Sequence, residues 1–191
     1  MQNETIAIHA GYNKKEGNGS MAVPITQTTA YAFRDSEHAA NLFALKELGP
    51  IYTRLTNPTT DVLEQRFAAL EGGAAAICVA SGQSAIFYAV ANVAEAGDNI
   101  LISDKLYGGA VTLLSHTMKR FGITTKVFRS EDASNLEEQI DGKTKAIFFE
   151  SLSNPQIAIT DVEKVVEIAK RHGVLTICDN TVATAALFNP I

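Results

Sequence analysis

The chain contains 191 residues, of which 46% are hydrophobic and 19% are charged, a composition typical of a globular protein with a buried core. Sixteen lysine and arginine residues against twenty-one aspartate and glutamate residues give a net charge of -5, which excludes the basic surface that nucleic-acid binding requires. Neither a signal peptide nor an apolar run of the ~18 residues that a membrane span needs is present. We therefore expect a soluble, cytoplasmic protein with no nucleic-acid or membrane partner.

The N-terminal part, residues 1–60, shows no sustained hydrophobic period, and we interpret it as an arm. Within this arm, residues 35–48 have the spacing of a helix, with Ser36 as the N-cap. A second helix is predicted to begin at Asp61, which forms a capping-box pattern with Glu64, and to end at Gly72.

From residue 61 onward, predicted strands alternate with predicted helices. The predicted strands are residues 75–80, 99–103, 125–128, 146–150 and 174–178, and the last of them is apolar enough to be covered on both faces. The predicted helices open at Ser81, Ala110, Ser134 and Thr160, and glycines end two of them at 122 and 173. This alternation indicates a doubly wound α/β sheet, and we interpret residues 61–191 as one incomplete domain.

Neither cysteines nor histidines have the spacing of a metal site. Cys78 and Cys178 lie in separate apolar runs, which suits a reducing compartment, and the four histidines are scattered along the chain. We expect no metal site.

Polar residues follow several predicted strands, at the edge where parallel α/β sheets bind ligands. Ser81, Gly82 and Gln83 open a helix whose N–H groups could bind a phosphate, although a plain serine N-cap has the same pattern. Tyr107 precedes two glycines and could stack on a planar ligand or belong to an ordinary turn. These four residues form the first half of a candidate ligand site.

The second half of the candidate site comes from residues further along the chain and from the arm. Asp179 ends an apolar strand, where its charge favours a cationic partner, although it could instead cap a loop, and Thr181 follows it. Asn154 precedes a proline, a pattern that fits a tight turn as well as a ligand contact. Arg54, two residues after Tyr52, offers a guanidinium suited to phosphate or carboxylate, or is simply hydrated.

In this order, the motifs resemble those of the Cys/Met metabolism family of enzymes that depend on pyridoxal 5'-phosphate (PLP). The resemblance covers nearly the whole chain, and its most specific segments are residues 51–64, 70–73, 80–85, 107–109, 150–155 and 179–181. It implies PLP as cofactor and the large domain of a fold type I PLP-transferase, a mainly parallel sheet flanked by helices that is incomplete at its C-terminus. Residues 4–11, 37–43 and 52–54 are most similar to the O-acetylhomoserine sulfhydrylase branch.

The resemblance implies a role for each residue near the cofactor phosphate. Ser81, Gly82 and Gln83 are expected to bind the phosphate. Tyr107 is expected to stack on the pyridine ring and is a candidate catalytic residue. The family's Schiff-base lysine is expected beyond Ile191, so that the 191-residue chain alone is expected to be inactive or nearly so.

The remaining candidates are expected at the ring and at a subunit interface. The resemblance implies that Asp179 pairs with the protonated ring nitrogen, that Thr181 supports it, and that Asn154 lies near the ring hydroxyl and the substrate carboxylate. It also implies that Tyr52 and Arg54 reach the phosphate of a neighbouring subunit. A homodimer or homotetramer is therefore expected.

The function implied by the resemblance is a γ-replacement in methionine biosynthesis, in which sulfide replaces acetate on O-acetylhomoserine to give homocysteine. A cystathionine γ-synthase or γ-lyase of the same family is the alternative within the enzyme class. A hypothesis of another class is a catalytically inactive cofactor-binding or assembly partner that keeps the cleft without the lysine.

Overall fold

The chain folds into two units, which the computed structural model describes over residues 2–15 and 19–191. The first unit runs to Cys78 and also includes Ile191, and the second unit is Val79–Pro190. The arm was predicted to end at residue 60. The first unit extends further and also contains the helix over Pro58–Glu71. Within the described residues, no helix combines the length and the apolar character needed to cross a lipid bilayer.

Three helices make up the regular structure described in the first unit: α1 (Asn3–His9), α2 (Ser36–Phe43) and α3 (Pro58–Glu71). α1 packs on α3, where Nε of Arg66 donates to the carbonyl oxygen of Ala10 at 3.0 Å. Gly11 has a φ of 76°, and a Cβ at this position would lie 2.6 Å from the carbonyl oxygen of Val62. Glycine is therefore required where the chain approaches α3.

The predicted starts of α2 and α3 were wrong, because in each case an earlier Asp or Asn side chain caps the helix. Asp35, rather than Ser36, accepts the backbone N–H three residues further on, and α2 ends at Phe43, well before residue 48. Asn57 caps α3, and Pro58 occupies the first helical position, where a missing N–H carries no penalty. α3 therefore begins three residues before Asp61.

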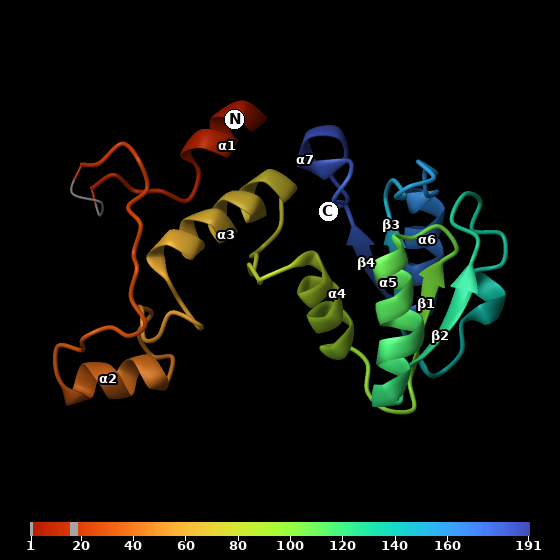
Figure 1. The fold of residues 1–191 in the computed structure, drawn as a ribbon, viewed down its shortest axis with the longest axis horizontal. Helices are drawn as coiled ribbons and strands as arrows, with labels where there is room; N and C mark the ends of the chain where they lie inside the picture. The colour runs from red at the N-terminus through yellow and green to blue at the C-terminus, as the bar shows by residue number, and fades with distance from the viewer. Residues whose placement is uncertain (1, 16–18) are drawn as a thin grey trace. The chain divides into compact units, whose positions relative to one another are not determined.

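The second unit is a four-stranded parallel sheet with the strand order β2-β1-β3-β4 (Figure 1). Its strands are β1 (Asn99–Ser103), β2 (Thr124–Phe128), β3 (Thr144–Glu150) and β4 (Leu175–Asp179). Its helices are α4 (Gly82–Ala91), α5 (Gly108–Thr112), η1 (Leu113–Thr117), η2 (Met118–Phe121), η3 (Glu137–Gln139), α6 (Val162–His172) and α7 (Thr184–Leu187). This arrangement confirms the predicted α/β class.

The helical segments of the second unit follow the prediction with local differences. Residues 108–121 form one continuous segment that passes from an α-helix through a π-helix to a 3₁₀-helix, and Gly122 ends it with a φ of 80°. Only a 3₁₀ turn forms after Ser134. Asp161 caps α6, because the hydroxyl of Thr160 donates instead to the carbonyl oxygen of Glu150 at 2.6 Å.

One predicted strand does not form, and another is less buried than predicted. Residues 75–80 pair with no strand in the described part of the chain, and Ile77 is 85% exposed. The N–H of Cys78 donates instead to the carboxylate of Glu64 at 2.8 Å. β4 forms within one residue of the predicted strand, at an edge of the sheet. Ile177 packs on one face and Cys178 on the other, but Leu175 is exposed, so the predicted cover on both faces is only partial. An apolar run by itself does not specify which strand will lie beside it.

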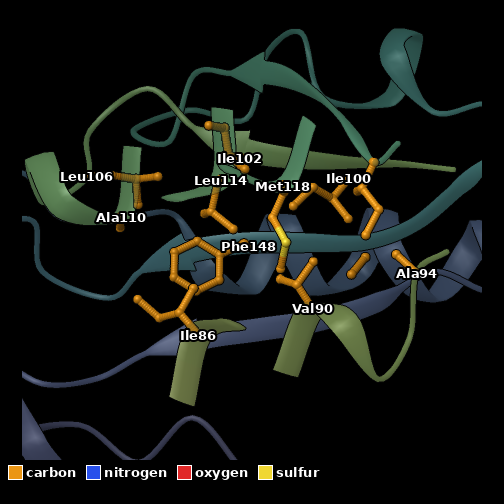
Figure 2. Close-up of a cluster of buried hydrophobic side chains, with 12 residues drawn as sticks. Ile86, Val90, Ala94, Ile100, Ile102, Leu106, Ala110, Leu114, Met118 and Phe148 are labelled. Atoms are coloured by element: carbon orange, nitrogen blue, oxygen red, sulfur yellow. The ribbon is translucent and has the colours of Figure 1, made fainter. Parts of the chain in front are cut away.

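Apolar side chains cover both faces of the sheet. The alternation of β1 sends Ile100 and Ile102 to one face and Leu101 to the other. The first face packs on α4 and on the helical segment 108–121, and Figure 2 shows this cluster, in which Val90, Leu114, Met118 and Phe148 meet. The opposite face packs on α6 through residues that include Phe128, Ile147, Phe149, Val165 and Ile168.

A group of polar side chains joins the strands at the amino edge of the sheet. Asp141 accepts hydrogen bonds from Nζ of Lys126 at 2.7 Å and from Nδ2 of Asn99 at 2.8 Å. The buried hydroxyl of Thr144 donates to Oδ1 of Asn99 at 2.8 Å. The hydrogen bond from Lys126, followed by that from Asn99, holds the pKa of Asp141 well below the usual range of a carboxyl group.

Val90→Ala is expected to destabilise the protein by about 2 kcal/mol, because it removes two buried methyl groups and leaves a cavity in the cluster of Figure 2. Val111→Ala is the matched control, because it makes the same change in the helical segment 108–121 at an exposed side chain. Its expected change is below about 0.5 kcal/mol. Urea denaturation measures the free energy of unfolding of both variants. Equal decreases in the two variants would contradict the burial of Val90.

Asp141→Asn is expected to lower stability at neutral pH, with the difference from wild type narrowing in acid. The folded-state pKa of Asp141 lies below the unfolded value of 3.8, so its contribution is present above that value and is lost as the pH falls towards the folded-state pKa. Urea denaturation from about pH 7 down to about pH 3 measures the difference. A difference that stays constant over this range would show that the carboxylate charge contributes nothing.

Candidate functional site

A pocket of about 320 Å³ lies at the carboxyl edge of the sheet. Its walls come from the start of α4 and from the loops that follow β1, β3 and β4, all within the second unit. Seven of the nine predicted site residues line it, namely Ser81, Gly82, Gln83, Tyr107, Asn154, Asp179 and Thr181. Parallel pairing explains the convergence, because it brings the carboxyl ends of the strands to one edge.

The start of α4 presents hydrogen-bond donors to the pocket. Ser81 is the N-cap, and its hydroxyl oxygen accepts the N–H of Ser84 at 3.1 Å. The N–H groups of Gly82 and Gln83 donate no hydrogen bond within the described residues. A Cβ at position 82 would meet no atom within 4 Å, so the backbone is open to a ligand. Unpaired N–H groups at a helix N-terminus suit an anion such as a phosphate.

The ring of Tyr107 lies beside this helix start. Tyr107 precedes α5, and its side chain is half exposed. A Cβ at Gly109 would lie 2.5 Å from Cε1 of Tyr107 and 2.9 Å from Nε2 of Gln83. Position 109 must therefore be a glycine if both side chains are to keep these places. The two glycines after Tyr107 are visible in the sequence, but only the structure shows that the ring requires the second of them.

Asp179 brings a carboxylate to the pocket lining. Its Oδ1 accepts the N–H of Thr181 at 3.0 Å and the hydroxyl of Thr181 at 2.5 Å. Within the described residues, Oδ2 accepts no hydrogen bond and the carboxylate forms no ion pair with a side chain. Thr181 therefore orients a carboxylate that still has one oxygen for a donor from a ligand.

Glu150 is a residue of the pocket that the list of expected ligand contacts missed. It is the last residue of β3, is 3% exposed, and pairs in the parallel register with Asp179. Oε1 accepts the N–H of Tyr107 at 2.7 Å, and Oε2 accepts the N–H of Asn154 at 3.0 Å. Burial raises the pKa of Glu150, although the hydrogen bonds from Tyr107 and Asn154 lower it. A carboxylate at the end of a buried strand was the available signal, as it was for Asp179.

Apolar side chains complete the pocket. Ile86 of α4, Leu152 after β3 and Val182 after β4 line it together with the polar groups. Asn154, which is joined to Pro155 by a cis peptide bond, closes the turn after β3. Apolar walls together with unpaired N–H groups and an open carboxylate oxygen fit a planar aromatic ligand that carries a phosphate and a protonated ring nitrogen.

Tyr52 and Arg54 belong to the first unit. The guanidinium carbon of Arg54 lies 5.6 Å from the centre of the Tyr52 ring. Thr53 between them donates from its N–H to the carbonyl oxygen of Thr29 at 2.9 Å and from its hydroxyl to that of Thr28. These bonds hold the segment locally, and its predicted role towards a neighbouring subunit stays a prediction.

No group of three or more His, Cys, Asp or Glu side chains able to hold a metal ion occurs in the part of the chain that the structure describes. The polar groups of the pocket are backbone N–H groups and hydroxyls, which can donate, and carboxylates, which accept, and they lie among apolar side chains.

Residues 4–191 match the protein family described as Cys/Met metabolism PLP-dependent enzyme. The O-acetyl-L-homoserine sulfhydrylase of Leptospira meyeri is 47% identical over 188 residues, which cover 98% of this chain and 42% of that protein. The chain therefore spans less than half the length of the curated relatives it matches.

Two solved structures are similar over the whole chain. One is a putative O-acetylhomoserine (thiol)-lyase from Campylobacter jejuni that contains N'-pyridoxyl-lysine-5'-monophosphate, with a TM-score of 0.96 and 56% identity over 47% of its own length. The other is cystathionine gamma-lyase from Lactobacillus plantarum, complexed with L-serine, with a TM-score of 0.90 and 32% identity over 47% of its own length. They confirm the predicted fold type.

Gly109→Ala is expected to displace the Tyr107 ring, because the added Cβ would overlap the ring edge. Gly108→Ala is the matched control, since a Cβ there meets nothing within 4 Å. Aromatic NMR spectra of tyrosine-labelled protein, assigned with Tyr107→Phe, measure the effect. We expect the Tyr107 resonances to move in the first variant and to stay in place in the second; unmoved resonances in both would show that the ring does not depend on Gly109.

Proposed function

The chain belongs to the Cys/Met metabolism family of PLP-dependent enzymes, and on this premise we propose that it forms the cofactor-binding part of an enzyme that converts O-acetylhomoserine and sulfide into homocysteine and acetate. The observation that carries the proposal is the pocket itself, whose lining includes two unpaired N–H groups and the open oxygen of Asp179. The names and the high identity of the sulfhydrylase relatives support the choice of reaction.

The start of α4 holds the phosphate in this proposal. The N–H groups of Gly82 and Gln83 donate to it, the hydroxyl of Ser81 adds a further contact, and the helix dipole favours the negative charge. Gly82 is suited to its place because its backbone is open on the pocket side. These contacts hold the phosphate of the cofactor, and the residues that follow the strands contact its ring.

The ring end depends on Tyr107, Asn154 and Asp179. Tyr107 offers an aromatic face for stacking, and Asn154 an amide for the ring hydroxyl and the substrate carboxylate. Oδ2 of Asp179 holds the proton on the ring nitrogen, while Thr181 fixes the orientation of the carboxylate. When bound, PLP supplies an electron sink that stabilises negative charge developing on the substrate carbon atoms. Ile86, Leu152 and Val182 exclude water from the ring.

Proton transfer to and from substrate requires a group that this pocket lining does not contain. No lysine is among its lining residues. We therefore propose that turnover needs a lysine from outside this pocket lining. Tyr107 is the lining residue whose hydroxyl is available for a supporting role in catalysis.

We also propose that the enzyme is a homodimer or homotetramer in which Tyr52 and Arg54 contact the phosphate of a neighbouring subunit. The guanidinium of Arg54 is suited to phosphate, and the hydrogen bonds of Thr53 hold it in a defined segment. A cytoplasmic location is proposed with it, because the family consists of metabolic enzymes.

The likeness to a cystathionine gamma-lyase supports a second candidate reaction on the same site. Assays of the full chain with O-acetylhomoserine plus sulfide, with O-acetylhomoserine plus cysteine, and with cystathionine separate the candidates. Homocysteine formation from sulfide supports the proposed function. Faster turnover with cysteine or with cystathionine would support a cystathionine γ-synthase or γ-lyase instead. PLP binding without turnover of any substrate would favour a catalytically inactive cofactor-binding or assembly partner.

Asp179→Asn is expected to lower kcat/KM for O-acetylhomoserine and sulfide by about a hundredfold or more, because the neutral amide no longer stabilises the protonated ring nitrogen. The measurement is steady-state homocysteine formation by the full chain. Asp104→Asn is the matched control: Asp104 follows β1, and its Oδ1 accepts both donors of Ser130 at 3.0 and 3.1 Å, outside the pocket. Equal effects of the two substitutions would overturn the role of Asp179.

A further inference from the structure

A single buried carboxylate connects the two loops that carry Tyr107 and Asn154. The side chain of Glu150 reaches the loop after β1 through Oε1 and the loop after β3 through Oε2. Within the described residues, no lysine, arginine or histidine forms an ion pair with this carboxylate. The two N–H groups therefore compensate for the removal of its charge from water.

We propose that Glu150 is the positioning residue of the ring end of the pocket: it fixes the backbone at Tyr107 and Asn154, the two groups placed against the cofactor ring and substrate. The inference rests on the proposed function, since it assigns Glu150 to the same site. Glu150 itself acts through these two residues.

The neighbouring strand explains why two carboxylates stand together here. Glu150 and Asp179 are register partners on β3 and β4, so their side chains leave the sheet on the same face. Protein donors occupy both oxygens of Glu150, whereas Asp179 keeps Oδ2 open. The negative charge of Asp179 adds to burial in raising the pKa of Glu150. Glu150 thus binds protein N–H groups, and Asp179 keeps an oxygen that can accept a hydrogen bond from the ligand.

The contacts of the side chain are separate from those that hold the strand. The carbonyl oxygen of Glu150, not its carboxylate, accepts the hydroxyl of Thr160, and the N–H of Ser151 continues the pairing to Asp179. A change in the side chain alone therefore leaves the end of β3 paired. Its direct effect falls on Tyr107 and Asn154.

Glu150→Gln tests the proposal, because the amide has the same shape but only one acceptor oxygen, and its NH₂ group opposes the second N–H. In the cofactor-free full chain we expect the affinity for PLP to fall about tenfold, from the loss of a charge-assisted hydrogen bond. The affinity for inorganic phosphate is expected to stay unchanged, since Ser81, Gly82 and Gln83 are not touched. Calorimetric titration measures both.

The amide signals of Tyr107 and Asn154 provide a readout that does not involve turnover. In protein labelled with ¹⁵N-tyrosine and ¹⁵N-asparagine, we expect at least one of the two amide protons to move upfield in Glu150→Gln, because a bond to a carboxylate is lost. Glu137→Gln is the matched control, since Glu137 pairs with Arg171 and His172 on the surface. It should change neither the amide signals nor the PLP affinity.

An unchanged PLP affinity in Glu150→Gln, or an equal loss for PLP and phosphate, would overturn the positioning role. Failure of the wild-type chain to bind PLP would contradict the proposed function instead, so the two failures are distinguishable. If Glu150→Gln does not fold, Glu150→Asp takes its place. This variant keeps the charge but is one methylene shorter and cannot span both N–H groups, and the same split between PLP and phosphate is expected.

Discussion

Parallel pairing is the constraint on which the rest of the second unit depends. A parallel sheet needs cover on both faces, which α4 and the segment 108–121 provide on one side and α6 on the other. The same pairing brings the ends of β1, β3 and β4 to one edge, so loops that are distant in sequence meet there. The pocket is a consequence of strand direction, and the residues after each strand supply its chemistry.

The elements that could be predicted are those whose boundaries depend on local chemistry. β1 forms at the predicted residues because it is short and apolar, and Gly72, Gly122 and Gly173 end their helices because each adopts a positive φ. The errors arose where the outcome depended on a distant partner. The apolar character of residues 75–80 did not reveal that no described strand pairs with them, and β4 reads as a buried strand although it lies at an edge.

The same distinction explains which parts of the site could be found from sequence. Ser81, Tyr107 and Asp179 stand at strand or helix ends, where their polarity marks them. The contact between Glu150 and Tyr107 spans 43 positions, so nothing near Glu150 in the sequence indicates which N–H groups its carboxylate will accept. The steric demand on Gly109 likewise depends on the paths of the Tyr107 ring and of the Gln83 side chain from α4.

The polar group at the amino edge, built on Asn99, Asp141 and Thr144, lies at the end of the strands remote from the pocket. It ties the strands together without using any residue that lines the site. Natural variation at the carboxyl edge can therefore alter which substrate is accepted while the strand register persists. Such a division makes the scaffold evolvable: a common sheet can serve enzymes of different specificity, in keeping with the shared fold of a thiol-lyase and a gamma-lyase.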